Sequence, residues 1–304
     1  MTAMTLQRAT AARVFMDTLV SFEVLHEEAQ SESADRAIAE AFGWFAEVER
    51  VCSRFDPASE LRRLCERTDD VVRPSPLLFE AIAFAVELAE RTDGAFEPAI
   101  GARMEAAGFD TNYRTGERHL QGMAPGATWR DIEIDRENGT VRLRRPLTID
   151  LGAVAKGMAI DLAARAFASF PGFVIDAGGD IFAGGTNADS EPWAIGLRDP
   201  FGGAALAGQV AISDAAICTS GGYERRAADG HHILDPRGGG NATACASVTV
   251  IAASAMAADA MATAAFVLGP EKGIALLEDE DAEGCLTTGD GRTVATQGFE
   301  AYLR

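Results

Sequence analysis

Hydrophobic and polar positions follow two spacings along this chain, and together they predict a mixture of strands and helices. Residues 18–24 have the apolar, β-branched character of a strand. After Ser33, a serine suited to cap a helix, Ile38, Phe42 and Phe45 recur on one helical face. The chain is therefore predicted to begin with a strand covered by a helix.

Capping and turn residues mark further elements in the first half. Ser59 is a candidate N-cap, and Ser75-Pro76 is typical of the start of a helix, here one that ends at residues 93–94. The apolar residues of 132–143 alternate on either side of Asn138-Gly139, which is a strong signal for a β-hairpin.

The second half alternates short apolar runs with glycine-rich bends, and the runs predict strands. These runs are residues 173–176, 181–185, 193–197, 209–212, 216–223 and 246–251. Ser254 is predicted to cap an alanine-rich helix over 255–268 that stops at Gly269-Pro270, and two or three short strands are expected to follow. The pattern as a whole predicts an α+β fold.

The segment 149–161 in mid-chain carries the first candidate chemistry. Residues 147–149 are read as the end of a strand, followed by a turn and a helix, which places Asp150 at the strand end, Ala153 in the turn and Lys156 in the first helical turn. The first amides of a helix have no internal partner and can bind anions. A Walker A loop is excluded, because Met-Ala follows Gly157. The alternative is that Asp150 is a helix cap and Lys156 is solvated.

Two further segments carry reactive groups. Asp259 and Thr263 are four residues apart and share a face of the alanine-rich helix, where a carboxylate and a hydroxyl could ligate Mg²⁺. An exposed aspartate is the alternative, although the surrounding alanines and methionines indicate a helix packed nearly all round.

His231-His232 precede an Asp-Pro-Arg segment and three glycines, which favours a loop that presents an imidazole; a histidine in the core explains them equally well.

Composition narrows the class of protein. With 304 residues, 47% of them hydrophobic and 24% charged, the chain is typical of a globular protein. The net charge of −19 argues against nucleic acid or anionic lipid as a partner, so an anionic ligand would need local cations or a metal. The five scattered cysteines are expected to be reduced thiols. No apolar run of membrane-spanning length and no secretory signal is present, so we expect a cytoplasmic protein without membrane insertion.

Eight short segments, in order, resemble the motifs of the ApbE family, the FAD:protein FMN transferases. They are residues 16–18, 53–61, 96–98, 150–157, 177–180, 219–223, 232–236 and 258–263. No single segment is decisive, but the ordered set is highly specific and spans nearly the whole chain. The resemblance implies one integrated domain over 16–304, with a helix-rich and a strand-rich lobe and the active site in the crevice between them. Residues 1–15 are expected to be a poorly ordered tail.

The resemblance also implies an activity and its residues. A Mg²⁺-dependent enzyme would cleave the pyrophosphate of its substrate FAD, attach FMN to a threonine hydroxyl of an acceptor flavoprotein, and release AMP. The implied catalytic residues are His232 as general base, with His231 as the open alternative, and the charged side chains of Asp259 and Lys156. The implied metal ligands are the Ala153 carbonyl, Asp259, Thr263 and the Ala262 carbonyl. The implied flavin contacts are Met16, Phe55, Ala95, Phe96, Glu97, Asp150, Lys156 and Leu234.

Several positions depart from the family pattern. Asp17 stands where glycine is usual, Glu97 replaces an aspartate, Phe55 a tyrosine, and Ala99 and Gly238 each replace a threonine. These departures leave the implied metal ligands intact and bear on substrate detail or rate. Two alternatives to the transferase therefore stay open: a Mg²⁺-dependent FAD pyrophosphatase, in which water replaces the acceptor hydroxyl, and an FAD-binding protein without catalysis.

Overall fold

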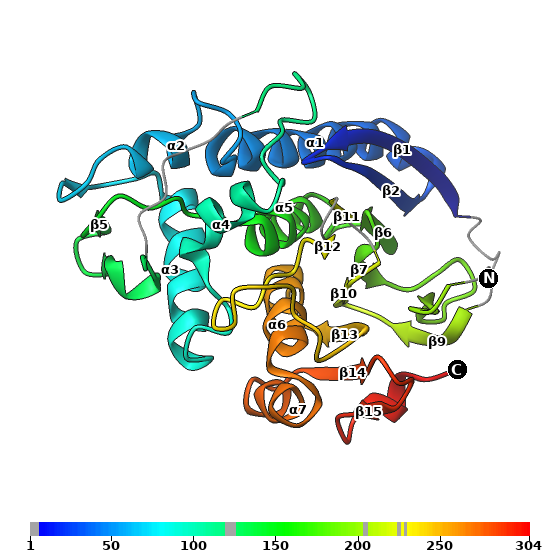
Figure 1. Cartoon of the computed structure of the whole chain (residues 1–304). Helices are drawn as coiled ribbons and strands as arrows, with labels where there is room; N and C mark the ends of the chain where they lie inside the picture. Colours follow the sequence, from blue (N-terminus) through cyan, green and yellow to red (C-terminus); the bar gives the residue numbers. More distant parts are fainter. Residues whose placement is uncertain (1–5, 119–125, 203–205, 224–225, 228–229) are drawn as a thin grey trace.

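An antiparallel sheet of eight strands forms the centre of the fold, with helices stacked along one of its faces (Figure 1). The computed structural model describes residues 6–118, 126–202, 206–223, 226–227 and 230–304. In spatial order the strands of the sheet are β1 (Gln7–Phe15), β2 (Thr18–His26), β6 (Gly172–Ala177), β7 (Asp180–Gly185), β10 (Ala215–Gly221), β13 (Ser247–Ala252), β14 (Glu283–Thr287) and β15 (Thr293–Ala295).

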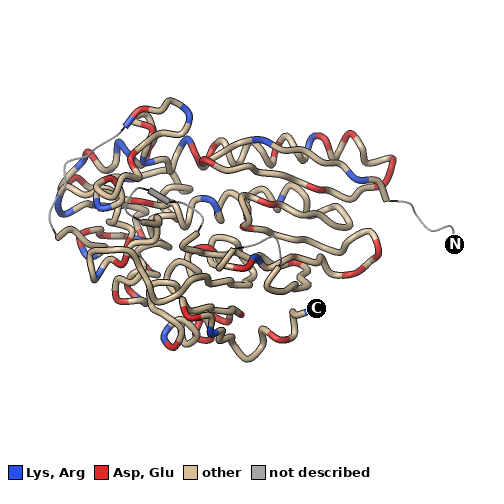
Figure 2. The backbone as a smooth tube through the Cα atoms, turned by 45° about the vertical axis from the view of Figure 1, so that its right-hand side comes forward, with Lys and Arg blue, Asp and Glu red and all other residues tan. Residues whose placement is uncertain are grey.

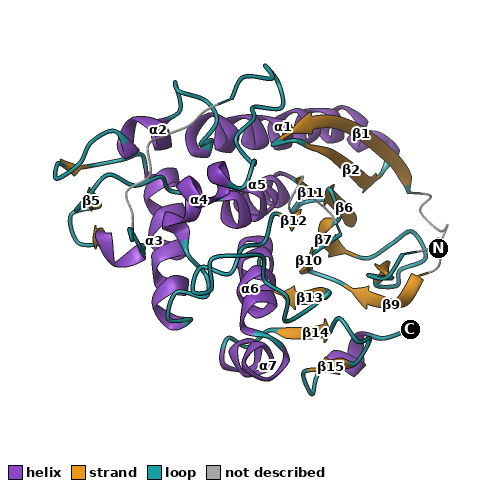
Figure 3. Ribbon diagram, viewed as in Figure 1, coloured by secondary structure: helices purple, strands orange, loops and turns teal. Residues whose placement is uncertain are grey.

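The helices come from both halves of the chain (Figure 3). They are α1 (Ser31–Cys52), α2 (Glu60–Cys65), α3 (Pro76–Arg91), α4 (Gly101–Ala106), α5 (Gly152–Ala166), α6 (Ala255–Leu268) and α7 (Pro270–Asp279). Short 3₁₀ turns are η1 (Glu28–Gln30), η2 (Pro98–Ile100), η3 (Trp129–Asp131) and η4 (Phe299–Tyr302). The smaller sheets comprise β3 (Val71–Val72) with β5 (Thr140–Leu143) and β4 (Ile132–Asp135), β8 (Trp193–Arg198) with β9 (Leu206–Ile212), and β11 (Arg226–Ala227) with β12 (Gly230–His231).

Side chains alternate across the sheet and divide the core into two parts. On β10 and β13, Cys218 and Val250 join the large core formed with the helices. Their neighbours Ile217 and Ile251 join a smaller core that includes Val210 of β9. Successive residues of a strand point to opposite faces, so one sheet supports both cores. The helical face is the one that carries the site.

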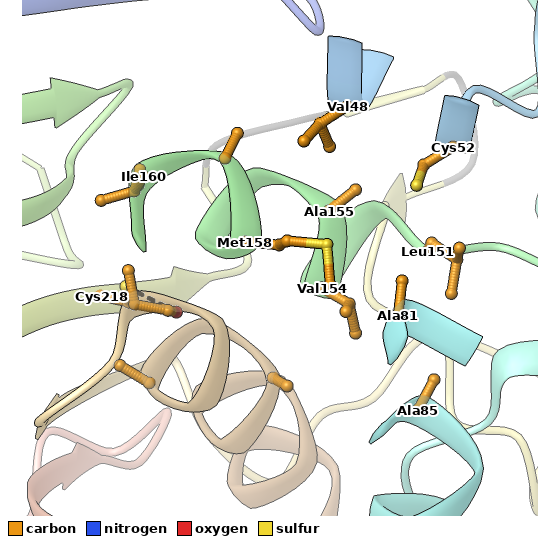
Figure 4. Packing of buried hydrophobic residues seen from close by; sticks show 14 of the residues in the cluster. Val48, Cys52, Ala81, Ala85, Leu151, Val154, Ala155, Met158, Ile160 and Cys218 are labelled. Atoms are coloured by element: carbon orange, nitrogen blue, oxygen red, sulfur yellow. Dashed lines mark hydrogen bonds between the residues drawn. The ribbon is translucent and has the colours of Figure 1, made fainter. Parts of the chain in front are cut away.

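Helix α5 is the central helix of the large core. Figure 4 shows its Val154, Ala155 and Met158 among Val48 of α1 and Ala81 of α3, and all five side chains are buried. On its other side α5 packs against α6 so closely that a Cβ at Gly157 would lie 2.4 Å from the Ala255 carbonyl oxygen. This close approach brings side chains of both helices to one place.

Several local predictions are confirmed. Ser59, Ser75 and Ser254 each accept a hydrogen bond from a backbone N–H in the first turn of the following helix, at 3.0, 3.4 and 3.1 Å. The hairpin around Asn138-Gly139 is present as β4 and β5. The mixed α+β fold is confirmed as well, although its main sheet takes β1 and β2 from the half that was expected to be rich in helices.

Other local predictions are wrong. The first long helix begins at Ser31, and Ser33 accepts a bond from the Arg36 side chain instead of capping the helix. The expected tail over residues 1–15 is, from Gln7 to Phe15, an edge strand paired with β2; residues 1–5 lie outside the described residues. Helix α7 was missed, because Pro270 was read as a stop although proline also suits the first turn of a helix.

The segment before α5 also differs from its prediction. Residues 147–149 are a buried loop, held by the Thr148 carbonyl, which accepts from the Gly101 N–H at 3.0 Å. Because α5 already begins at Gly152, Ala153 lies within the helix and Lys156 lies in its second turn, whereas the turn and the first helical turn were expected.

Charged residues of both signs occur throughout the described chain, as the coloured backbone shows (Figure 2), and acidic residues are in excess in the sequence. None of the helices in the described ranges combines the length and the apolar character needed to cross a membrane.

Candidate active site

Three charged side chains from three different elements meet between α5, α6 and the sheet. The Lys156 ammonium of α5 forms an ion pair with Asp180 at the start of β7 and lies 3.7 Å from the Asp259 carboxylate of α6. The two carboxylates are almost entirely buried, with side-chain exposures of 3% and 10%, and Lys156 is 22% exposed. Burial alone would lower the pKa of Lys156, but the two carboxylates outweigh it and raise that pKa, so the lysine is charged.

Helix α6 supplies Asp259 and, one turn later, Thr263. The Thr263 hydroxyl lies 3.2 Å from the Ser220 hydroxyl of β10, so both predicted ligands point from α6 toward the sheet and α5. This settles the alternatives for Asp259, which is buried beside a cation and not solvated. Cys218 of β10 is buried, and its burial raises the pKa of the thiol well above its usual value.

Asp161 fixes the start of α6 against α5. Its carboxylate accepts hydrogen bonds from the Ala255 N–H at 2.7 Å, the Met256 N–H at 3.0 Å and the Ser254 hydroxyl at 2.9 Å. Burial raises its pKa, even though the two amides and the hydroxyl act in the opposite direction. A negative charge at a helix N-terminus is favourable, and here it also sets the position of Asp259 one turn further along.

A second group of side chains is arranged around the buried guanidinium of Arg54. Its Nε donates to Asp150 at 2.6 Å, and its Nη2 donates to the Phe109 carbonyl at 2.6 Å. The guanidinium also stacks over the Phe55 ring, with 4.0 Å from Cζ to the ring centroid. Asp150 in turn accepts from the Gly152 N–H, the first amide of α5, at 2.7 Å, although the N-cap residue of this helix is Leu151 and not Asp150.

The adjacent histidines have different surroundings. His231 is held on both ring nitrogens: Nε2 lies 3.0 Å from the Ala242 carbonyl, and Nδ1 accepts from the Ile233 N–H at 3.2 Å. This pattern is that of a neutral ring with the proton on Nε2, so both ring nitrogens of His231 are already engaged by backbone groups. His232 instead stacks edge-on against Phe109, at 6.5 Å between ring centroids. The carbonyl of that phenylalanine is the one bound by Arg54.

The loop that contains Ala95, Phe96 and Glu97 lies directly beside Asp150. The Asp150 N–H donates to the Pro98 carbonyl at 2.8 Å, while Ala95 and Phe96 are buried. Glu97 accepts from the Ala99 N–H at 2.9 Å, and its burial raises the pKa to about 7.

Arg103 of α4 joins this loop to the segment that follows the histidines. It donates to the carbonyls of Pro236 and Asp235 at 2.6 and 2.9 Å. Leu234, a predicted flavin contact, lies in this segment and is bridged to Asn241. The 95–101 loop and the 231–241 segment are therefore fixed to each other.

Met16 lies at the tight turn between β1 and β2, where its N–H donates to Glu49 of α1 at 3.2 Å. Met16 and Asp17 are both left-handed, with φ of 48° and 61°. A two-residue hairpin turn of type I′ requires this conformation at both positions, and glycine adopts it most readily. Aspartate is among the residues that adopt it at moderate cost, so the turn keeps its geometry.

Four contributors to the site were not assigned a role from the sequence: Asp180, Arg54, Asp161 and Arg103. Asp180 was noticed only as part of the 177–180 motif, in which two glycines precede a carboxylate. Arg54 lies inside the 53–61 motif in the same way. A charged residue within a motif was thus the available signal, whereas nothing in the sequence distinguishes Asp161 and Arg103 from surface residues.

The donor set fits a hard cation such as Mg²⁺, which prefers oxygen ligands. Asp259 and Thr263 of α6 supply a carboxylate and a hydroxyl. The carbonyls of Ala262 in α6 and Ala153 in the first turn of α5 stay predicted ligands. Over the described ranges, no group of three or more His, Cys, Asp or Glu residues is arranged to hold a metal ion. A metal at this site would therefore depend on carbonyl and hydroxyl oxygens beside one carboxylate.

Comparison with known proteins gives the family. A sequence profile described as the ApbE family matches residues 16–286. The chain belongs to the ApbE family. Among relatives of this ApbE-family chain, a FAD:protein FMN transferase of Treponema pallidum is 36% identical over 229 residues, or 66% of this chain and 62% of that protein. One of Haemophilus influenzae is 25% identical over 95% of this chain and 89% of that protein.

Solved structures agree with the family assignment. The ApbE protein of Thermotoga maritima has a TM-score of 0.86 at 28% identity and covers 98% of this chain and 100% of that one. The flavin transferase ApbE of Vibrio cholerae has a TM-score of 0.83 at 25% identity, with the same coverage. The chain spans less than two thirds of the T. pallidum relative and 43% of a relative from Rhodobacter capsulatus. The domain limits of 16–304 stay a prediction.

Proposed function

We propose that this protein transfers FMN from FAD to a threonine hydroxyl of an acceptor flavoprotein, with Mg²⁺ as cofactor and AMP as the second product. Relatives and structural neighbours that carry the name FAD:protein FMN transferase or flavin transferase support the reaction class. The oxygen-rich donor set at Asp259 and Thr263 supports the metal. A cytoplasmic location remains a prediction from the sequence.

The observation that carries the proposal is the convergence of motifs that are far apart in the sequence. Phe55 and Asp150 meet at Arg54, and the same guanidinium binds the carbonyl of Phe109, on whose ring His232 packs. Six residues after Asp150, in the second turn of α5, Lys156 lies 3.7 Å from the Asp259 carboxylate. Two buried carboxylates around one ammonium are seldom the most stable arrangement for a fold, and charged groups held in this way are frequent at functional sites.

The roles of the residues follow from their chemistry. A threonine Oγ attacks the phosphorus on the FMN side of the pyrophosphate, a new P–O bond forms, and the bond to the bridging oxygen breaks so that AMP departs. We assign the transfer of the hydroxyl proton to His232, because both ring nitrogens of His231 are already engaged. Lys156 holds a positive charge beside the pyrophosphate, and Phe55, Ala95–Glu97, Asp150, Met16 and Leu234 form the flavin side of the site.

When bound by Asp259, Thr263 and the carbonyls of Ala153 and Ala262, Mg²⁺ supplies charge neutralisation for the phosphate oxygens. Reactions of this class are limited by charge repulsion and alignment, so cations and positioning provide most of the acceleration. The net charge of −19 disfavours the binding of an anion to this protein, and positive charge at the site offsets this repulsion locally.

The test is transfer to an acceptor. Purified protein, FAD and Mg²⁺ are mixed with candidate acceptor flavoproteins, and each acceptor is examined for covalent flavin fluorescence and for the mass of an FMN adduct on threonine. The proposal expects an adduct and one AMP for each flavin transferred. Free FMN and AMP formed without any acceptor would identify a pyrophosphatase, and FAD binding without AMP would identify a binding protein.

A matched variant tests the metal assignment in the same assay. Asp259→Ala is expected to abolish Mg²⁺-dependent AMP release, while FAD binding falls less because the flavin side of the site is built from other segments. Asp279→Ala, which changes an aspartate at the end of α7, is the control and should leave AMP release unchanged. Unchanged release in Asp259→Ala would contradict the metal assignment.

A further inference from the structure

We propose that Asp180 is a positioning residue that holds the Lys156 ammonium away from Asp259 and thereby sets how tightly Asp259 can bind a divalent cation. The inference rests on the metal site of the proposed function. It concerns a residue whose side chain belongs to neither the implied ligands nor the implied flavin contacts.

The geometry of the three charges carries the inference. Lys156 is in direct ion-pair contact with Asp180, but it stands 3.7 Å from Asp259, which exceeds a normal hydrogen bond. One ammonium between two buried carboxylates leaves these three groups with a net charge of −1, and Lys156 neutralises the nearer carboxylate, Asp180, more fully than Asp259. Asp259 is therefore the carboxylate better able to accept a second cation.

Asp180 is itself held in place. Its Oδ1 accepts from the Thr219 N–H at 3.3 Å, so Oδ2 is the atom directed at Lys156. Thr219 is fixed in turn by a 2.9 Å hydroxyl contact with Thr249 on the neighbouring strand. The anchor of the lysine thus belongs to the rigid sheet, whereas Asp259 belongs to α6.

Loss of the charge at Asp180 would release Lys156 to Asp259. Coulomb's law applies with an effective dielectric constant of about 20. Moving the ammonium from 3.7 Å into contact then raises the equilibrium constant for the Lys156–Asp259 ion pair roughly tenfold. A divalent cation would have to overcome this stronger pair. Affinity for the cation should then fall about tenfold, although no ligand has been removed.

The experiment measures Mn²⁺ binding to the full chain, without FAD, by the electron paramagnetic resonance signal of the free ion. Asp180→Asn keeps an acceptor for the Thr219 N–H and removes only the charge, so it should weaken binding about tenfold. Lys156→Met removes the competing cation and should bind Mn²⁺ at least as tightly as the wild type. In the Lys156→Met background, adding Asp180→Asn should weaken binding clearly less than tenfold, because only the longer-range attraction of the Asp180 charge is then lost.

The double variant separates positioning from direct ligation. If Asp180 were a ligand, Asp180→Asn would weaken binding at least as much without the lysine as with it, and that result would overturn the inference. Equal affinity of Asp180→Asn and the wild type would overturn it too. Asp180→Ser, a second change that removes the charge, carries the same expectation should the asparagine variant fail to fold, and melting in a chelator checks the fold of each.

The wild-type titration also tests the proposed function separately. If Asp259→Ala bound Mn²⁺ as tightly as the wild type, the metal site itself would be wrong, and the inference with it. If Asp259→Ala lost binding but Asp180→Asn did not weaken it, the metal site would stand and only the role of Asp180 would fail.

Discussion

Replacement of Gly157 by alanine tests the close packing of α5 on α6 that brings Lys156 to Asp259. The added Cβ would lie 2.4 Å from the Ala255 carbonyl oxygen and 2.5 Å from the Met256 Cα, both backbone atoms at the start of a capped helix. Such atoms cannot rotate away, so the helices must separate. Overpacking at this severity lowers the free energy of unfolding by roughly 3 kcal/mol, and the higher helix propensity of alanine raises it by about 1 kcal/mol. The expected net loss is about 2 kcal/mol.

Gly43 offers a matched control for this prediction. It lies inside α1, is exposed, and has nothing within 4 Å of an added Cβ, so Gly43→Ala should stabilise the protein by about 1 kcal/mol through helix propensity alone. Urea unfolding of the two variants should therefore give shifts of opposite sign. If Gly157→Ala matched Gly43→Ala in sign and size, the close helix contact and the geometry built on it would be refuted.

Three further predictions concern charged groups. Arg54→Met leaves the Asp150 side chain, which is only 15% exposed, without its cation and should cost about 3 kcal/mol in urea unfolding. Arg50→Met breaks an exposed pair and should cost less than about 1 kcal/mol. Equal costs of the two changes would contradict the burial argument. Asp161→Ala removes three hydrogen bonds at the start of α6 and should cost about 3 kcal/mol by the same measurement, and a loss below about 0.5 kcal/mol would speak against this cap. Glu97 has a folded pKa of about 7 against an ordinary value of 4.5, so the folded state binds the proton more tightly and stability falls as pH rises through this window. From pH 4.5 to 8 the wild type should lose about 3 kcal/mol relative to Glu97→Gln, and parallel pH profiles would refute the burial of this carboxyl.

Local signals predicted the elements whose ends are marked by capping or turn residues. The caps at Ser59, Ser75 and Ser254 were correct because a serine side chain satisfies the orphan amides of a helix through local geometry alone. Residues 147–149 were misread because their apolar character reflects burial, while the Thr148 carbonyl accepts from Gly101 of α4 and the Ile149 N–H donates to the Cys65 sulfur of α2. Burial in a loop and burial in a strand leave the same pattern in the sequence.

The site could be predicted only in part, for a related reason. Asp259 and Thr263 share a helix face, so four-residue spacing was enough to pair them. The partnership of Lys156 with Asp180 and that of Arg54 with Asp150 join different elements, and no local spacing encodes such contacts. The different surroundings of His231 and His232 also needed the fold, because the Ala242 carbonyl and the Phe109 ring that they contact are not adjacent to them in the sequence.

The most direct test of the account is the position of a bound metal. A crystal of the full chain soaked with Mn²⁺ and FAD would show the ion by its anomalous scattering. The account predicts one peak within bonding distance of Asp259 Oδ2 and Thr263 Oγ1, with the pyrophosphate beside it and Lys156 still paired with Asp180. A peak on other residues, with Asp259 and Thr263 both outside its coordination shell, would contradict the site described above.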